Sequence, residues 1–110
     1  METYVKVKVV FAGMHYWPDA KNFLRFYHRH LFYITATLPV SHDDRDIEFF
    51  EFRDLLSQYI SNIYCSPNSH TADFGTRSCE QIAKEILEKF DCSEVEVSED
   101  NENSAIVRRT

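Results

Sequence analysis

The chain opens with a regular alternation of apolar and polar residues from Tyr4 to Phe11, in which valines fall on one side and lysines on the other. This period of two is typical of a half-buried strand. A second alternating run starts at His28 and stops at Pro39, because proline cannot donate to a sheet. The two runs predict neighbouring antiparallel strands, joined by a long connection over residues 12–27.

Two helices are predicted in the middle of the chain. Apolar residues at three- and four-residue steps predict one buried helical face, formed by Phe52, Leu55, Leu56, Tyr59 and Ile63. Residues 66–75 have the composition of a loop. Ser78 and Gln81 stand at the spacing of a capping box, so a second helix should begin there. We expect that helix to bury Ile82, Ala83, Ile86, Leu87 and Phe90.

Two short strands should end the chain. Val95, Val97 and Glu99 alternate, residues 100–103 provide turn chemistry, and a last strand follows over 105–107. The order ββααββ predicts a single α+β domain over residues 1–110, with an antiparallel sheet and two helices on one face. Such a thin sheet has unpaired edge strands. The chain also contains more aromatic residues than one small core needs. We therefore expect a homo-oligomer.

Composition narrows the class of partner. The chain has 110 residues, a net charge of −6 and 44% hydrophobic residues, which suits one compact domain. Its acidic balance argues against a nucleic-acid partner, and no apolar stretch is long enough for a bilayer, so we expect a cytoplasmic protein with no membrane association. The three cysteines are an odd number without paired spacing and are interpreted as reduced thiols.

Three histidines form the main candidate for chemistry. His28 and His30 project from one face of the predicted strand, about 6.6 Å apart at Cα. His15 lies in the connection after the first strand, which can bring it to the start of the second. Three imidazoles would make an open zinc site with a fourth position free for water or substrate. The alternative is three unrelated histidines paired with nearby carboxylates.

The same residues carry a resemblance to a known family. Residues 11–15 (FAGMH) and 28–33 (HRHLFY) resemble the F-x-A-x-H … H-G-H-x-Y signature of the 6-pyruvoyl-tetrahydropterin synthase and 6-carboxy-tetrahydropterin synthase family. Further segments resemble its V-x-D-F-x-x-L, P-T-x-E-x-x-A and V-x-E-T motifs, in residues 49–55, 78–83 and 97–99. The match in order and approximate spacing covers nearly the whole chain. Both queuosine-type and biopterin-type pathways use enzymes of this family.

The resemblance implies a tunnelling fold, in which ββααββ subunits close into an oligomeric β-barrel as a trimer or hexamer. It also implies a zinc ion (Zn2+) held by His15, His28 and His30, and dihydroneopterin triphosphate or a related pterin as the substrate. In that family, zinc polarises the hydroxyl and carbonyl oxygens of the substrate side chain while a base moves protons. The implied activity is therefore that of a zinc-dependent carbon-oxygen or carbon-carbon lyase.

The resemblance also implies substrate-binding residues. By position, Glu99 is the carboxylate that anchors the pterin ring, with Ser78 and Cys79 as further substrate-binding residues. A carboxylate can accept two parallel hydrogen bonds from a 2-amino-4-oxo heterocycle. Glu99 should point inward, which is costly unless a ligand or cation pairs it. The alternative is that the strand frays and leaves Glu99 hydrated. Tyr16 and Trp17 form either part of the core or the wall of a ligand pocket.

The chain departs from the family at the catalytic base. Leu24 stands where the family has its catalytic cysteine, and a leucine cannot move a proton. The assisting aspartate-histidine pair falls near Tyr64 and Cys65. Four residues could replace the base, although none of them belongs to a known motif: His70, Cys65, Asp19 and Tyr27. The chain is thus either an enzyme with a different base or an inactive homologue that binds or sequesters a pterin-like or purine-like ligand; a structural oligomer stapled by zinc is a third possibility.

Overall fold

A five-stranded sheet with strand order β3-β1-β2-β4-β5 carries two helices. The computed structural model describes all residues, Met1–Thr110. The elements, in chain order, are β1 (Tyr4–His15), a short 3-10 helix η1 (Phe23–Arg25), β2 (His28–Pro39), α1 (Phe49–Tyr64), β3 (Ala72–Gly75), α2 (Cys79–Phe90), β4 (Glu94–Glu99) and β5 (Asn103–Arg108). No helix has the length and apolarity needed to cross a membrane.

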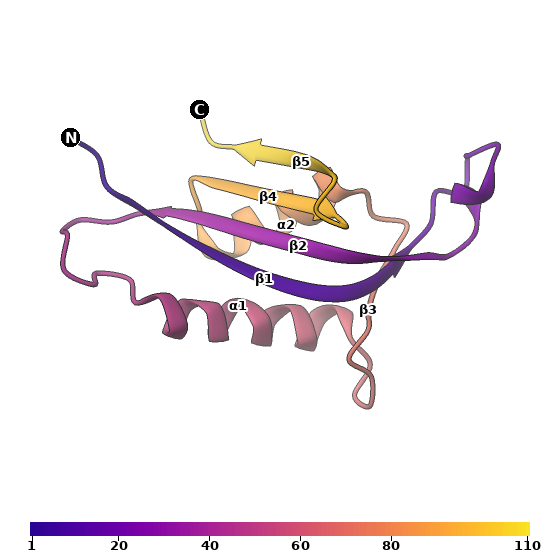
Figure 1. Cartoon of the computed structure of the whole chain (residues 1–110), viewed down its shortest axis with the longest axis horizontal. Helices are drawn as coiled ribbons and strands as arrows, with labels where there is room; N and C mark the ends of the chain where they lie inside the picture. The colour runs from indigo at the N-terminus through magenta and orange to yellow at the C-terminus, as the bar shows by residue number, and fades with distance from the viewer.

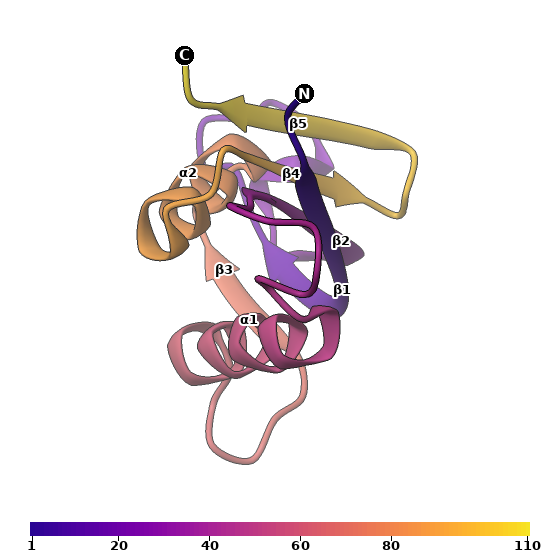
Figure 2. The same cartoon turned by 90° about the vertical axis from the view of Figure 1, so that its left-hand side faces the viewer.

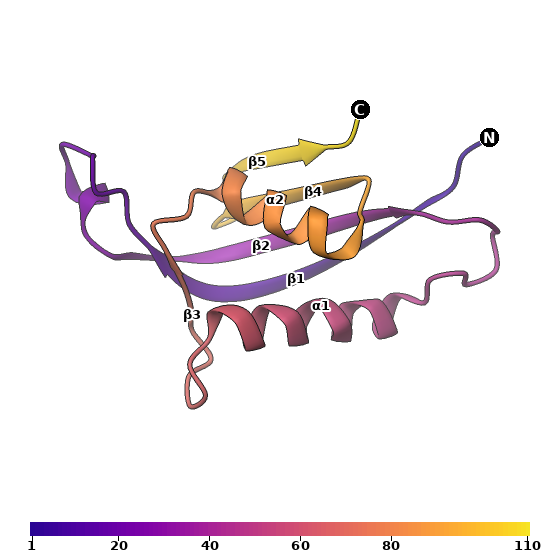
Figure 3. The same cartoon turned by 180° about the vertical axis from the view of Figure 1, so that it is seen from behind.

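The two helices cover one face of the sheet. The long strands β1 and β2 run side by side as an antiparallel pair, and β4 and β5 extend the sheet beyond β2 (Figure 1). Both helices lie on the same side of these strands (Figure 2). From behind, α1 follows β1 and α2 follows β4 (Figure 3). The predicted α+β class, with two helices on one face, is therefore confirmed.

The core lies between this sheet face and the helices. It includes Phe32, Ile34, Val95 and Val97, all fully buried, from the strand positions that alternation predicts to face inward. From α2 the core takes Ile82, Ala83, Ile86 and Leu87, as expected, while Phe90 packs against the core from a half-buried position. The predicted capping box is present: the Ser78 side chain accepts from the backbone of Gln81, and the Gln81 side chain accepts from the backbone of Ser78.

Two expectations about the sheet were wrong. Residues 72–75, predicted as loop, form β3, which pairs in parallel with the end of β1. The predicted order ββααββ therefore gains a strand between the helices. The first strand also does not stop at Phe11 but continues to His15, so that His15 belongs to β1 and not to the connection. Pairing with both β2 and β3 keeps the end of β1 in strand conformation.

The buried face of α1 also differs from the prediction. Leu55 and Ile63 are each 56% exposed, whereas Ile60 and Tyr64 are buried. The buried positions follow steps of four residues along the helix: Phe52, Leu56, Ile60 and Tyr64. Apolar residues occur on several faces of this helix, so periodicity does not select one of them.

Candidate metal centre

On the core-facing side of the sheet, the apolar side chains of β1 and β2 give way to histidines at one end of the two strands. In the antiparallel register, His15 stands opposite His28, and Gly13 stands opposite His30. On the other side of β2, Phe32 stands opposite Glu99. Residues that pair directly or lie two positions apart share a face of the sheet. The strand register alone therefore brings three imidazoles and one carboxylate together.

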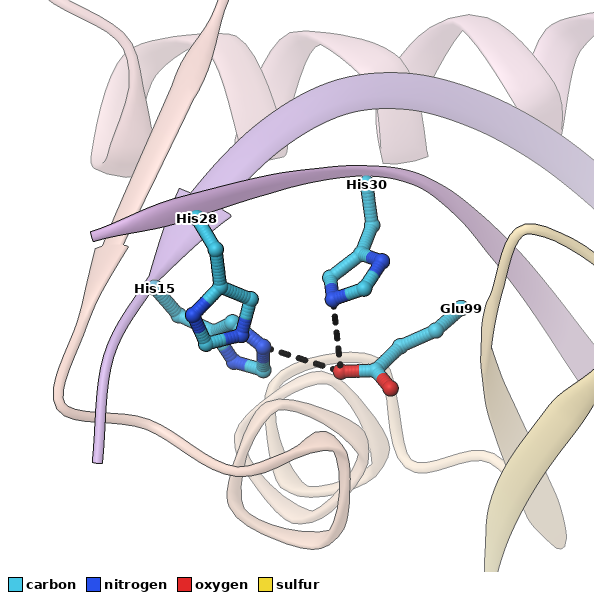
Figure 4. A group of neighbouring side chains, drawn as sticks. All are labelled: His15, His28, His30 and Glu99. Carbon is cyan, nitrogen blue, oxygen red and sulfur yellow. Dashed lines mark ion pairs between the residues drawn. The ribbon is translucent and has the colours of Figure 1, made fainter. Parts of the chain in front are cut away.

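These four side chains form a compact cluster (Figure 4). His15, His28, His30 and Glu99 each offer one ligand atom, and these atoms all lie within 4.8 Å of one another. The ring centroids of His15 and His28 are 4.6 Å apart, and those of His28 and His30 are 5.0 Å apart. The cluster has the residue types of a zinc site.

Each histidine uses its Nδ1 atom in a hydrogen bond to an acceptor outside the cluster. Nδ1 of His15 donates to the carbonyl oxygen of Arg77 at 2.9 Å, and Nδ1 of His28 donates to that of Phe26 at 2.9 Å. Nδ1 of His30 donates to Oδ2 of Asp100 at 2.7 Å. Because each Nδ1 carries the proton, each neutral ring presents the lone pair of Nε2. This pattern is typical of metal-binding histidines.

One further observation indicates that these residues fit a divalent cation. The Nε2 atom of His30 is buried and has no hydrogen-bond partner. A buried polar atom without a partner is costly and calls for an explanation such as an ion. The atom faces the cluster, so a cation bound by the three Nε2 atoms would remove the deficit.

Asp100 is a site residue that the sequence reasoning missed. It follows β4 directly and has a positive φ of 56°, so the chain turns there towards β5. Its second oxygen, Oδ1, accepts from the backbone N–H of Leu31 at 2.9 Å. The hydrogen bonds from Leu31 and then from His30 lower the pKa of the Asp100 carboxyl. In the sequence, Asp100 has only the signal of a turn residue, and the strand register is what shows that this turn lies beside His30.

A phenylalanine pair closes the inner side of the cluster. The ring of Phe32 lies edge-on to His15 at 5.2 Å and contacts Phe74 at 4.7 Å between centroids. A Cβ atom on Gly13 would come within 2.7 Å of Phe74 and 2.8 Å of Phe32. Glycine at this position therefore lets the two rings pack beneath the histidines.

A cavity of about 450 Å³ opens beside the cluster. His15, His28 and Glu99 contribute to its wall, and segments from η1, the start of α2 and β5 complete it. Tyr16 and Trp17 also line this cavity, and Trp17 is 58% exposed, so Trp17 belongs to the pocket wall and not to the core. A volume of this size is sufficient for a small-molecule ligand.

The expected substrate-binding residues lie in this cavity wall. Ser78 and Cys79 line the cavity at the start of α2, next to Glu99. Burial, together with the negative charge of Glu99, raises the pKa of the Cys79 thiol to about 12. Cys79 is therefore a neutral thiol at physiological pH. Glu99 belongs to a regular strand and is 28% exposed at its side chain, which argues against the alternative of a frayed, hydrated residue.

The candidate replacement bases do not line the cavity. His70 is exposed in the loop before β3, Asp19 is exposed in the turn after β1, and Cys65 is the C-cap residue that follows α1. The hydroxyl of Tyr27 donates to Asp73 at 3.1 Å. Leu24, in contrast, does line the cavity. Leu24 thus forms part of the cavity wall, whereas none of the four candidate bases does.

Comparisons with known proteins support the fold. No protein-family model and no curated protein sequence matches the chain. Among solved structures, an uncharacterized protein of Wolinella succinogenes aligns with 12% identity and a TM-score of 0.75, over 100% of this chain and 99% of that one. A catalytic-residue variant of Plasmodium vivax 6-pyruvoyltetrahydropterin synthase, with glutamate replaced by alanine, aligns with 17% identity and a TM-score of 0.68 over 100% and 99%.

The Plasmodium falciparum 6-pyruvoyl tetrahydropterin synthase is a further neighbour, with 16% identity and a TM-score of 0.58 over 98% of each chain. These alignments span both partners almost completely. The chain therefore has the fold of 6-pyruvoyltetrahydropterin synthases, the tunnelling fold expected from the sequence.

Proposed function

We propose that this chain is a zinc-dependent lyase of the tetrahydropterin synthase type, acting on dihydroneopterin triphosphate or a related pterin. The observation that carries the proposal is the arrangement of His15, His28 and His30. Each Nδ1 atom is held by an acceptor outside the cluster, and the Nε2 atoms converge. The buried Nε2 of His30 has no hydrogen-bond partner.

The cavity supplies the other groups that such a substrate needs. A zinc ion bound by the three histidines would polarise hydroxyl and carbonyl oxygens of the substrate side chain. Glu99 would accept two hydrogen bonds from the amino and ring N–H groups of the pterin. Tyr16 and Trp17 offer aromatic surface for stacking against a planar ring. Ser78 and Cys79 would contact the ring beside Glu99.

A carboxylate is the best-supported proton acceptor. Leu24 cannot fill that role, and His70, Cys65 and Asp19 lie outside the cavity wall. In the Plasmodium vivax neighbour, a glutamate is named as the catalytic residue. The cavity of this chain contains two carboxylates, Glu80 and Glu99. Because Glu99 is assigned to the pterin ring, Glu80 is the carboxylate left to accept a proton.

A second function is favoured by Leu24. An apolar side chain in the cavity wall adds contact area for a ligand and no proton transfer. This supports the alternative that the chain is an inactive homologue, which binds or sequesters a pterin-like or purine-like ligand. Both functions use the same histidines and Glu99, and they differ only in turnover.

Assembly into a homo-oligomer, a trimer or hexamer, belongs to the same proposal. β5 pairs only with β4 and leaves one edge of the sheet open. On the sheet face away from the helices, apolar residues are exposed: Val10 at 48%, Leu31 at 40% and Ile106 at 51%. Open edges and exposed apolar groups favour pairing with further copies of the chain.

One experiment separates the functions. Zinc-loaded protein is incubated with dihydroneopterin triphosphate, and release of inorganic triphosphate is followed together with binding of the pterin. The enzyme proposal predicts release that depends on zinc and is lost in His28→Ala. Binding without release would favour the sequestering protein, and absence of both would contradict the two functions. His42→Ala, which removes an exposed histidine outside the cluster, is the matched control.

A further inference from the structure

The Glu99 carboxylate contacts two histidines of the cluster, and a residue that only anchors a ligand does not need these contacts. Its Oε2 atom lies 2.9 Å from Nε2 of His15 and 3.6 Å from Nε2 of His30 (Figure 4). Glu99 is the last residue of β4, and its side chain is 28% exposed. The carboxylate therefore reaches from the cavity wall to two of the three imidazoles.

These contacts bring lone pairs together. His15 donates from Nδ1 to the carbonyl of Arg77, so in its neutral form it directs a lone pair at Glu99. Oε2 of Glu99 has only lone pairs to offer in return. A proton between His15 and Glu99 would relieve this one contact, but it would leave Nε2 of His30 without a partner. A cation shared by all of these atoms relieves every contact at once.

The distances suit a four-ligand site. In tetrahedral zinc centres with bonds of about 2.0–2.1 Å, neighbouring ligand atoms are roughly 3.3 Å apart. The separations of 2.9 Å and 3.6 Å from Glu99 to the two imidazoles lie on either side of this value. Oε2 of Glu99 is thus at ligand-to-ligand distance from two of the imidazoles, within a cluster whose four ligand atoms all lie within 4.8 Å of one another.

We infer that Glu99 is the fourth protein ligand of the metal when the cavity is empty, so that the resting site is closed. The site opens when a ligand in the cavity draws Glu99 away. This inference rests on the proposed function, because it assumes that the three histidines bind a metal. It goes beyond the proposed function because it gives the Glu99 carboxylate two alternating partners, the metal and the ring N–H groups of a heterocycle.

The consequence is a coupling between the cavity and the metal. A 2-amino-4-oxo heterocycle that engages both oxygens of Glu99 removes that ligand from the metal and frees a coordination position. A molecule without this pattern of donors leaves the site closed. Ligand recognition at Glu99 would thereby decide when the metal becomes accessible.

The test uses the full chain loaded with Co²⁺, whose visible absorption reports its ligands, and azide as a small anion that binds an open coordination position. In the wild type, azide should leave the cobalt bands unchanged. In Glu99→Ala and in Glu99→Gln, azide should shift them, and Co²⁺ affinity should fall by about tenfold or more. Glu96→Ala, which removes a carboxylate from the opposite face of the same strand β4, should behave like the wild type.

Adding pterin, which has the 2-amino-4-oxo pattern, should make the wild type respond to azide. A wild-type protein that responds to azide without pterin, to the same extent as Glu99→Ala, would overturn the inference but leave the three-histidine site intact. A chain that binds no Co²⁺ would overturn the inference and the metal site together. Circular dichroism of the two Glu99 variants checks that they are folded.

Discussion

Asp100 accepts a hydrogen bond of 2.7 Å from Nδ1 of His30 across the turn between β4 and β5. His15 and His28 use backbone carbonyls for the same purpose, so His30 is the only histidine of the cluster that a side chain orients. Asp100 also accepts from the backbone of Leu31. The pair therefore ties the orientation of a candidate ligand to the β4–β5 turn.

Replacing Asp100 should weaken metal binding without removing a ligand. Asp100→Ala frees the His30 ring to rotate and to exchange its tautomer, and we expect Zn²⁺ affinity to fall by about 10- to 100-fold. Competition with a chelating dye measures the affinity. Glu102→Ala, which removes a carboxylate from the same turn, is the control. Equal affinities in the two variants would show that Asp100 does not position His30.

Removing one histidine should reduce the metal content. His28→Ala deletes one of the converging Nε2 atoms, so elemental analysis of the purified protein should find less than one zinc per subunit. The control His42→Ala should keep the wild-type content, because His42 lies in the loop before α1. Unchanged metal content in His28→Ala would refute the site.

Gly13→Ala should destabilise the fold. The new methyl group would approach Phe74 and Phe32 to less than 3 Å, and these rings are fully buried. Overpacking of this kind typically costs about 1–3 kcal/mol, which chemical denaturation can measure as a lower free energy of unfolding. Ala12→Ser, at the neighbouring half-buried position, should change stability by only about 0.5 kcal/mol. A Gly13→Ala protein as stable as the wild type would mean that the rings can move apart.

Cys65 should react slowly with alkylating reagents. Burial raises the pKa of its thiol, and the reactive form is the thiolate. The thiolate fraction at a given pH is therefore below that of a free cysteine, and the alkylation profile should shift to higher pH. Iodoacetamide labelling followed by peptide mass spectrometry measures the profile at this residue. A profile at or below that of free cysteine would contradict the burial of the Cys65 thiol.

Much of this fold follows from short-range patterns in the sequence. Strict alternation in β1 and β2 specifies which residues face the core, and the capping box at Ser78 fixes the start of α2. Both features depend on neighbouring residues only. β3 could not be found in this way, because it has four residues and exists through its parallel pairing with the end of β1.

The candidate site was predictable only in part. His28 and His30 follow from alternation within one strand, His15 follows from its place after the first strand, and Glu99 follows from a resemblance that spans the chain. Their meeting depends on the register of β1 against β2 and of β2 against β4. Asp100 could not be predicted as a site residue, because its role depends on that register as well. The sequence marks it only as a turn residue, and its partner His30 is 70 positions away.

The most direct test of the central claim is X-ray absorption spectroscopy at the zinc edge of the zinc-loaded protein. The account predicts a first shell of nitrogen and oxygen atoms only, at about 2.0–2.1 Å, with outer-shell scattering from three imidazoles. Sulfur at about 2.3 Å would instead place a cysteine such as Cys79 on the metal. That result, or the absence of bound zinc, would contradict a centre built from His15, His28, His30 and Glu99.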